Sequence, residues 1–187
     1  SAFIRAEIRG MGGLTKGGAQ NVYLDNANSY SGPTFVSEGT LFLRDPKALG
    51  SSSTITIEGL GQVYLELGTE IEGVDLLVGS LDSSRSVLRT NDGHNRWGGN
   101  IVIDNVDNLG NLVSQARINV NNREILSIDG NIYGEQLAGS TGTPIRTDTA
   151  LNDARVVSTE GSSAGIINLN GQFRDTAPGP VTDPVTS

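Results

Sequence analysis

The chain is a series of short segments in which apolar and polar residues alternate. The clearest are TITIE (54–58), QVYLEL (62–67), NIVID (100–104), RINVN (117–121), EILSID (124–129) and GIINLN (165–170). Alternation with a period of two is typical of a β-strand with one buried face. The inward residues that it predicts are Ile55, Ile57, Val63, Leu65, Leu67, Ile101, Ile103, Ile118, Val120, Leu126, Ile128, Ile167 and Leu169. The sequence therefore predicts an all-β fold.

The breaks between these segments favour a solenoid over a sandwich of hairpins. Tight Asp-Gly or Asn-Gly turns do not join two close-spaced alternating runs, as hairpins would require. The breaks are longer and contain glycine, which suits coils whose short strands stack in parallel. We predict β-helix coils over residues 1–172, with an excursion loop at about 134–160 that contains a short helical turn around 150–155. A Pro-rich tail or linker is predicted at 173–187.

Composition narrows the range of functions. The net charge is −8, which disfavours binding to nucleic acid. The chain has no cysteine, so disulfides, thiolate nucleophiles and Cys-based zinc sites are absent. No apolar run approaches the ~20 residues of a transmembrane helix. The first residues read as a strand, with Ile4, Ala6 and Ile8 on one face, and not as a signal peptide. We expect the chain to be cut from a longer one.

One stretch resembles a known family. Residues 12–57 read GGLTKGGAQNVYLDNANSYSGPTFVSEGTLFLRDPKALGSSSTITI. This string is similar to the autotransporter-associated β-strand repeat, also called the passenger-associated transport repeat. The matching positions are Gly13, Leu14, Thr15, Lys16, Gly17, Asn28, Tyr30, Ser31, Gly32, Thr34, Val36, Gly39, Thr40 and Leu41. It departs from the family pattern in AQNVYLDN and at Pro33. The segment WGGNIVI (97–103) resembles the upstream part of such a unit.

The resemblance implies a right-handed parallel β-helix from a bacterial secreted or cell-surface passenger. In that family the repeat is associated with export and with folding outside the cell, and an outer-membrane barrel is expected in the full-length chain. It brings no catalytic residues, no cofactor and no metal, so the chain is predicted not to be an enzyme.

The motif residues also have physical interpretations of their own. Val36, Leu41 and Leu43 are predicted to point inward. Gly32 and Gly39 suit turns with positive φ.

Three polar residues of the motif carry separate expectations. Asn28 should hydrogen-bond local backbone or stack on an asparagine of the neighbouring coil. Tyr30 should cover an edge of the core with its hydroxyl in water. Lys16 is interpreted as a solvated surface charge in preference to a ligand contact.

Candidate chemistry outside the motif is sparse. His94, the only histidine, and Trp97 lie in the predicted loop NDGHNRWGG. They could serve as a general base and a sugar-stacking ring, or they could be an exposed histidine beside a tryptophan that caps the coil. Scattered carboxylates that stacking could bring together, as in calcium-dependent polysaccharide lyases, are Asp75, Asp82, Asp92, Asp104, Asp107 and Asp129; surface solvation is the alternative.

Three functions follow, from different classes. The first is a non-enzymatic structural segment that aids export or folding and presents adhesive loops. The second is a carbohydrate-binding or adhesion module, with a host or surface glycan or protein as its partner. The third is a polysaccharide-active β-helix enzyme. Exposed solenoid ends can also pair, so end-to-end self-association is expected to be possible.

Overall fold

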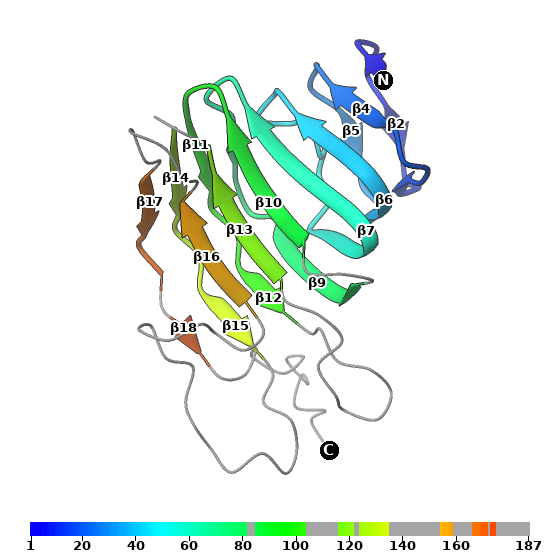
Figure 1. The fold of residues 1–187 in the computed structure, drawn as a ribbon. Coiled ribbons are helices and arrows are strands. Elements are labelled where there is room, and N and C mark those ends of the chain that lie inside the picture. Colours follow the sequence, from blue (N-terminus) through cyan, green and yellow to red (C-terminus); the bar gives the residue numbers. More distant parts are fainter. Residues whose placement is uncertain are drawn as a thin grey trace, which may run out of the picture.

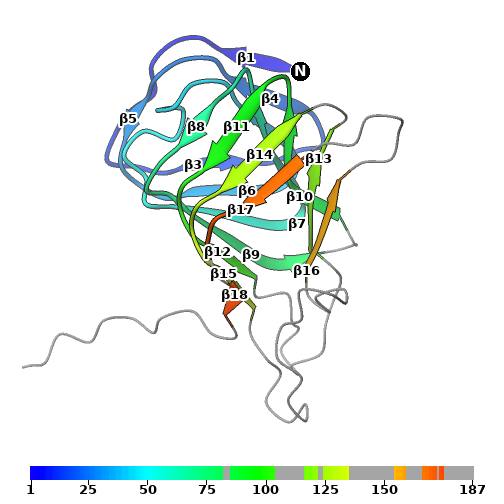
Figure 2. The ribbon, with the colours of Figure 1, turned by 90° about the vertical axis from the view of Figure 1, so that its left-hand side faces the viewer.

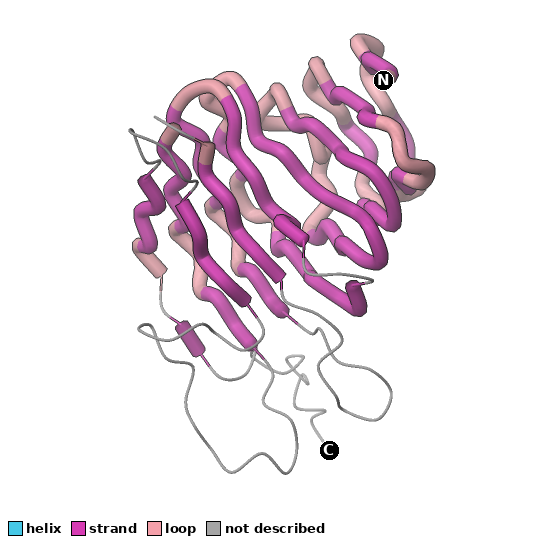
Figure 3. The backbone as a smooth tube through the Cα atoms, in the orientation of Figure 1, coloured by secondary structure: helices cyan, strands magenta, loops and turns pink. Residues whose placement is uncertain are grey.

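The fold is built from parallel β-strands. The computed structural model describes residues 1–81, 85–103, 116–121, 124–134, 154–158, 166–171 and 173–174, and their regular structure is entirely β-strand (Figure 3). The strands are β1 (Ala2–Ile4), β2 (Arg9–Gly10), β3 (Leu14–Lys16), β4 (Asn21–Leu24), β5 (Ser29–Tyr30), β6 (Thr34–Leu43), β7 (Thr54–Glu66), β8 (Glu70–Ile71), β9 (Asp75–Leu81), β10 (Arg85–Asn91), β11 (His94–Trp97), β12 (Ile101–Ile103), β13 (Ala116–Val120), β14 (Ile125–Ile128), β15 (Ile132–Gly134), β16 (Ala154–Ser158), β17 (Ile166–Leu169) and β18 (Phe173–Arg174).

The chain winds through three strand-lined faces in turn, as Figures 1 and 2 show. The first face holds β3, the start of β6, the start of β7, β9, β12, β15 and β18. The second face holds β1, β4, the ends of β6 and β7, β10, β13 and β16. The third face holds the pair β2–β5 and the sheet β8–β11–β14–β17. The pairings are parallel, which confirms the predicted solenoid.

Successive coils stack in strict register. One column on the first face runs through Leu14, Thr34, Ile55, Leu76, Ile101, Ile132 and Phe173. The numbering gives coil lengths of 20, 21, 21, 25, 31 and 41 residues between these partners. Strands β6 and β7 run unbroken from the first face to the second, with a register shift at the corner of each. Most of the added residues of the later coils lie in the sequence between β9 and β10, between β12 and β13, and between β15 and β16.

The core lies inside the three faces and is built from aliphatic columns. Most inward residues predicted from the alternation are buried: Ile55, Ile57, Val63, Leu65, Ile101, Ile103, Ile118, Val120, Leu126 and Ile128. Val36, Leu41 and Leu43 are buried as well. Burial of these side chains is the main stabilising term, at about 25 cal/mol per Å² of apolar surface.

One inward prediction is wrong. Leu67 is 60% exposed, because β7 ends at Glu66 and Leu67 turns the corner with a φ of 62°. Leu169 shares the inward register of the buried Ile128, but it is 38% exposed because β17 is the last described strand of its sheet. At the other end, Ile4 and Ile8 pack against the core but Ala6 is exposed, since β1 ends at Ile4.

The expected excursion loop and tail fall largely outside the described residues. Within the loop range, however, Ala154–Ser158 forms β16, which pairs with β13. The predicted helical turn is therefore wrong for residues 154 and 155. The first two residues of the predicted tail form β18, paired with β15. Within the described part of the chain, no helix has the length and apolar character needed to cross a membrane.

A column of glycines lets the coils approach closely where the third face turns into the first. A Cβ on Gly99 would overlap the carbonyl oxygen of Val74, one on Gly130 that of Gly99, and one on Gly171 that of Gly130. These glycines are required by contact between main chains and not by a positive φ.

We expect Gly99→Ala to destabilise the fold by about 1–3 kcal/mol, because the new methyl group must push two coils apart. Gly12 is the matched control, since it precedes Leu14 by the same two residues as Gly99 precedes Ile101 and a Cβ there meets nothing within 4 Å. Urea unfolding of both variants measures the difference. Equal stability of Gly99→Ala and Gly12→Ala would show that the column is not a packing constraint.

Candidate functional site

Two regions were singled out from sequence, and the first is the motif coil, which runs from β3 to β6. Its lysine is not on the surface. Lys16 is 4% exposed, and its Nζ donates hydrogen bonds to the carbonyl oxygens of Gly17 (3.0 Å), Gly18 (2.5 Å) and Glu38 (2.8 Å). Burial lowers the pKa of Lys16, while the negative charge of Glu38 acts against that shift. The prediction of a solvated charge is therefore wrong, because three main-chain carbonyls take the place of water.

Gly39 has a conformational role beside this lysine. It adopts a φ of 69° at the corner of β6, as predicted, and a Cβ there would crowd the Lys16 amine and the carbonyls of Gly18 and Gln20. The two residues thus act together. Because Gly39 has no side chain, the corner has room for the ammonium group of Lys16 to reach its three acceptors.

Asn28 ties three coils together. Its Oδ1 accepts a hydrogen bond from the backbone N–H of Ile8 at 2.8 Å, and its Nδ2 donates to the carbonyl oxygen of Ala48 at 2.6 Å. The partners are backbone groups, as predicted, but they are not local, because each lies 20 residues away in the neighbouring coil on one side or the other. The side chain is buried, so loss of either bond would leave an unpaired polar group inside the protein.

Tyr30 is a core residue. It is 1% exposed, and its hydroxyl lies 2.7 Å from Thr34 Oγ1, so the expected contact of the hydroxyl with water is wrong. Burial raises the pKa of Tyr30, and the hydrogen bond to Thr34 opposes this. Gly32, where a positive φ was expected, instead has no room for a side chain, because a Cβ would overlap the backbone of Gly12 and Gly13.

The second region contains His94 and Trp97, which lie in strand β11 and not in a loop. Trp97 is fully buried, so it cannot stack on a sugar ring, and it packs within the core beneath the third face. His94 is exposed on the outer side of the same strand. Strand alternation separates them, so the structure does not bring the two predicted contacts to one site.

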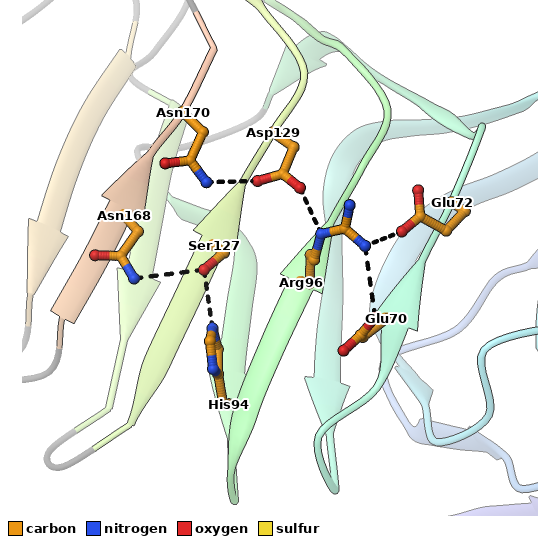
Figure 4. Close-up of polar contacts among 8 residues, drawn as sticks. All are labelled: Glu70, Glu72, His94, Arg96, Ser127, Asp129, Asn168 and Asn170. Atoms are coloured by element: carbon orange, nitrogen blue, oxygen red, sulfur yellow. Dashed lines mark hydrogen bonds and ion pairs between the residues drawn. The ribbon is translucent and has the colours of Figure 1, made fainter.

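A row of polar side chains crosses the outer third face from coil to coil (Figure 4). His94 Nε2 lies 2.9 Å from the Oγ of Ser127, and Asn168 Nδ2 donates to that same oxygen at 3.4 Å. Ser127 is 6% exposed. Among the described residues no carboxylate bonds to the other ring nitrogen of His94, so the third member of a Ser-His-Asp triad has no counterpart here.

A parallel row is centred on Arg96. Its guanidinium contacts Glu70 (3.5 Å), Glu72 and Asp129, so one cation on β11 bridges carboxylates from the coils on either side. Hydrogen bonding to Asp129 raises the pKa of Arg96. Two groups lower the pKa of Asp129. The first is the Asn170 amide, which donates to Asp129 Oδ1 at 2.7 Å, and the second is Arg96.

These rows join neighbouring coils. Among the described residues no group of three or more His, Cys, Asp or Glu side chains is placed to hold a metal ion. Of the predicted carboxylates, Asp75 accepts hydrogen bonds from the backbone and side chain of Asn100, and Asp129 pairs with Arg96. Asp92 is exposed at a turn, and Asp82, Asp104 and Asp107 lie outside the described residues.

Sequence reasoning named Asp129 as a candidate carboxylate but missed its pairing with Arg96, although a signal was present. WGGNI (97–101) and IDGNI (128–132) align without a gap, and the structure has Trp97 opposite Ile128 and Ile101 opposite Ile132. This alignment places Ser127 opposite Arg96 and Asp129 just beyond it, within reach of the guanidinium.

Comparison with known proteins supports the resemblance on one part of the chain. Residues 14–41 match the family model described as passenger-associated-transport-repeat. No curated protein and no solved structure gives a significant match. The match covers β3, β4, β5 and most of β6, which is the coil that contains Lys16, Asn28 and Tyr30. The repeat and the parallel solenoid fit a segment of an autotransporter passenger, and such a repeat implies a secreted or cell-surface protein.

We expect Lys16→Met to lower the free energy of unfolding by about 2–4 kcal/mol, because three carbonyls lose their donor at a site closed to water. Lys47→Met is the control, since Lys47 is exposed. Chemical denaturation of the two variants gives the comparison. If Lys16→Met unfolds at the same denaturant concentration as Lys47→Met, the lysine bonds contribute no net stability.

A pH dependence follows from Asp129. Because its pKa is lowered in the folded state, the stability it contributes is present above its ordinary value of 3.8 and is lost as the pH falls through the folded value. Asp129→Asn should therefore be less stable than the natural chain at about pH 6, and the gap should close by about pH 2. Thermal unfolding across this range measures it. Asp92→Asn, at an exposed turn, should show no such convergence, and parallel curves for Asp129→Asn would contradict the prediction.

Proposed function

We propose that this chain is a structural, non-enzymatic segment of a bacterial autotransporter-type passenger, in which the coil of residues 14–41 promotes folding during export. The supporting observation is that the residues matched by the family model span one full coil and part of the next, and that Lys16 and Asn28 bond this coil to its neighbours. A segment of this kind would act at the cell surface or in the secreted product.

The geometry gives this coil a reason to assist folding. In a parallel solenoid each coil supplies the hydrogen-bonding edge for the next, so folding propagates from a stable unit. Strand β6, which ends the motif, and its neighbour β7 are ten and thirteen residues long and pair along both faces. Asn28 fixes the third side of the same coil. The motif coil is thus bonded to neighbouring coils on all three faces, which suits a folding nucleus.

The later coils are longer, which suits a role in presenting loops. Coil length rises from 20 or 21 residues at the motif to 41 between Ile132 and Phe173. Most of the extra residues lie in the sequence at one corner, between the strands of the first face and those of the second. Connections that leave a solenoid commonly carry binding function. We therefore extend the proposal to adhesive loops at this corner, which would contact a surface glycan or protein.

The export role can be tested by deleting whole coils in register. Deletion of residues 14–33 removes one coil and most of the motif, and Leu14 is replaced by its register partner Thr34. Deletion of residues 55–75 removes one coil outside the motif and replaces Ile55 by Leu76. Each chain is placed between a secretion signal and an autotransporter outer-membrane barrel, and surface display is measured by protease accessibility on intact cells.

We expect display to fall several-fold for the 14–33 deletion and little for the 55–75 deletion. Urea unfolding of the purified chains separates a specific effect on export from a general loss of stability. Equal display of two deletions of equal stability would remove the export role and leave the motif as an ordinary coil.

A further inference from the structure

One charged group inside the solenoid is held by main-chain groups. The Lys16 amine lies at the corner where the first face turns into the second, and its three N–H donors meet the carbonyl oxygens of Gly17, Gly18 and Glu38. None of the ion pairs among the described residues includes Lys16. The positive charge is therefore held by the dipoles of peptide groups, with as many acceptors as the ammonium group has hydrogens.

The three acceptors are positioned by the main chain and not by the lysine side chain. Gly18 and Gly39 have φ values of 72° and 69°, and a Cβ on Gly39 would lie 2.5 Å from the Gly18 carbonyl oxygen. The third acceptor belongs to Glu38, which lies in β6 opposite Leu60 of β7. Left-handed turns at two glycines and a paired strand thus keep the oxygens together, so their arrangement does not need the Lys16 side chain.

The three oxygens fit one kind of ligand. Carbonyl oxygens only accept hydrogen bonds, so a group bound among them must donate, and their partial negative charge favours a cation. The distances of 2.5, 2.8 and 3.0 Å from Nζ are those of an ionised donor. A primary ammonium group supplies the charge and three donors, whereas an alcohol supplies one donor and a quaternary ammonium ion supplies none. The chemistry of the corner therefore selects a primary ammonium ion.

The stem of the lysine lies in the apolar core. Lys16 holds the register position of Val36 and Ile57, which are buried in the next two coils. Its methylene groups therefore continue an apolar column, and the amine alone needs polar partners. Truncation to alanine removes the part of the side chain that has the size and shape of the n-propylammonium ion.

We propose that this corner is a binding site for a primary alkylammonium ion, and that Lys16 fills it from within the chain. Two of the acceptors come from the coil of Lys16 and one comes from the next coil, so the bound ion joins the two. Because the ion is attached to the chain, closure of the coil does not depend on amines in the surrounding solution. This inference goes beyond the proposed export function and does not require it.

The experiment supplies the ion separately from the chain. Lys16→Ala is unfolded in urea with added n-propylammonium chloride, 1-propanol or tetramethylammonium chloride, at constant ionic strength. We expect propylammonium to raise the folding equilibrium constant of Lys16→Ala by at least ~10-fold, with saturation at high concentration. Propanol has the stem without the charge, and tetramethylammonium has the charge without N–H donors, so neither should stabilise this variant comparably. If Lys16→Ala is unfolded without additive, recovery of the folded state is followed instead.

Three matched variants test whether the ion binds at the corner. Lys47→Ala removes an exposed lysine and should not respond to propylammonium. Lys16→Met keeps most of the stem, leaves no room for a second one, and should not respond either. Gly39→Ala in the Lys16→Ala chain should remove the response, because the new Cβ would lie 2.7 Å from the position of Nζ.

The outcomes separate an ammonium site from simple filling of the core. Equal stabilisation of Lys16→Ala by propanol would show that only the stem matters, and equal stabilisation by tetramethylammonium would show a general effect of charge. Either result overturns the proposal. It is also overturned if propylammonium neither stabilises Lys16→Ala nor restores its folded state, or if Lys47→Ala gains as much as Lys16→Ala.

Discussion

Parallel main-chain pairing in strict register between successive coils is the constraint on which this structure depends. Because each strand bonds to the same position of the next coil, any residue type that is favourable once can be repeated along the axis. The aliphatic columns of the core, the glycines at the corner and the stacked rings of Tyr23, Phe42 and Tyr64 on the second face are all consequences of that register. A shift of one residue would turn every inward side chain outward, so the turns that set the register carry much of the specificity.

Polar residues follow the same register, and this explains why the motif has such a specific sequence although it contains no recognisable catalytic motif. Some main-chain groups at the corners have no main-chain partner in a neighbouring coil, yet burial requires them to have partners. Lys16 satisfies three carbonyls at one corner, and Asn28 satisfies an N–H and a carbonyl at another. The motif therefore encodes the closure of a coil.

The sequence was sufficient to predict the strands and the core, but it did not predict the environment of the polar residues. Alternation identified Ile55, Leu65 and Leu126 as inward because strand periodicity is local. It failed for Lys16, Tyr30 and Trp97 because their burial depends on residues about one coil away, and the coil lengths are visible only once the register is known. Leu67 failed for a local reason, since the strand ends one residue earlier than the alternation suggests.

The same register restricts where a binding function can arise. On the third face Arg96, Asp129 and Ser127 are already engaged with neighbouring coils, and on the second face the stacked rings and the ion pair of Arg44 with Glu66 are engaged in the same way. Side chains that satisfy each other along the axis have little capacity left for a ligand. The stacked columns of this solenoid thus use their side chains for contacts between coils, which stabilise the fold.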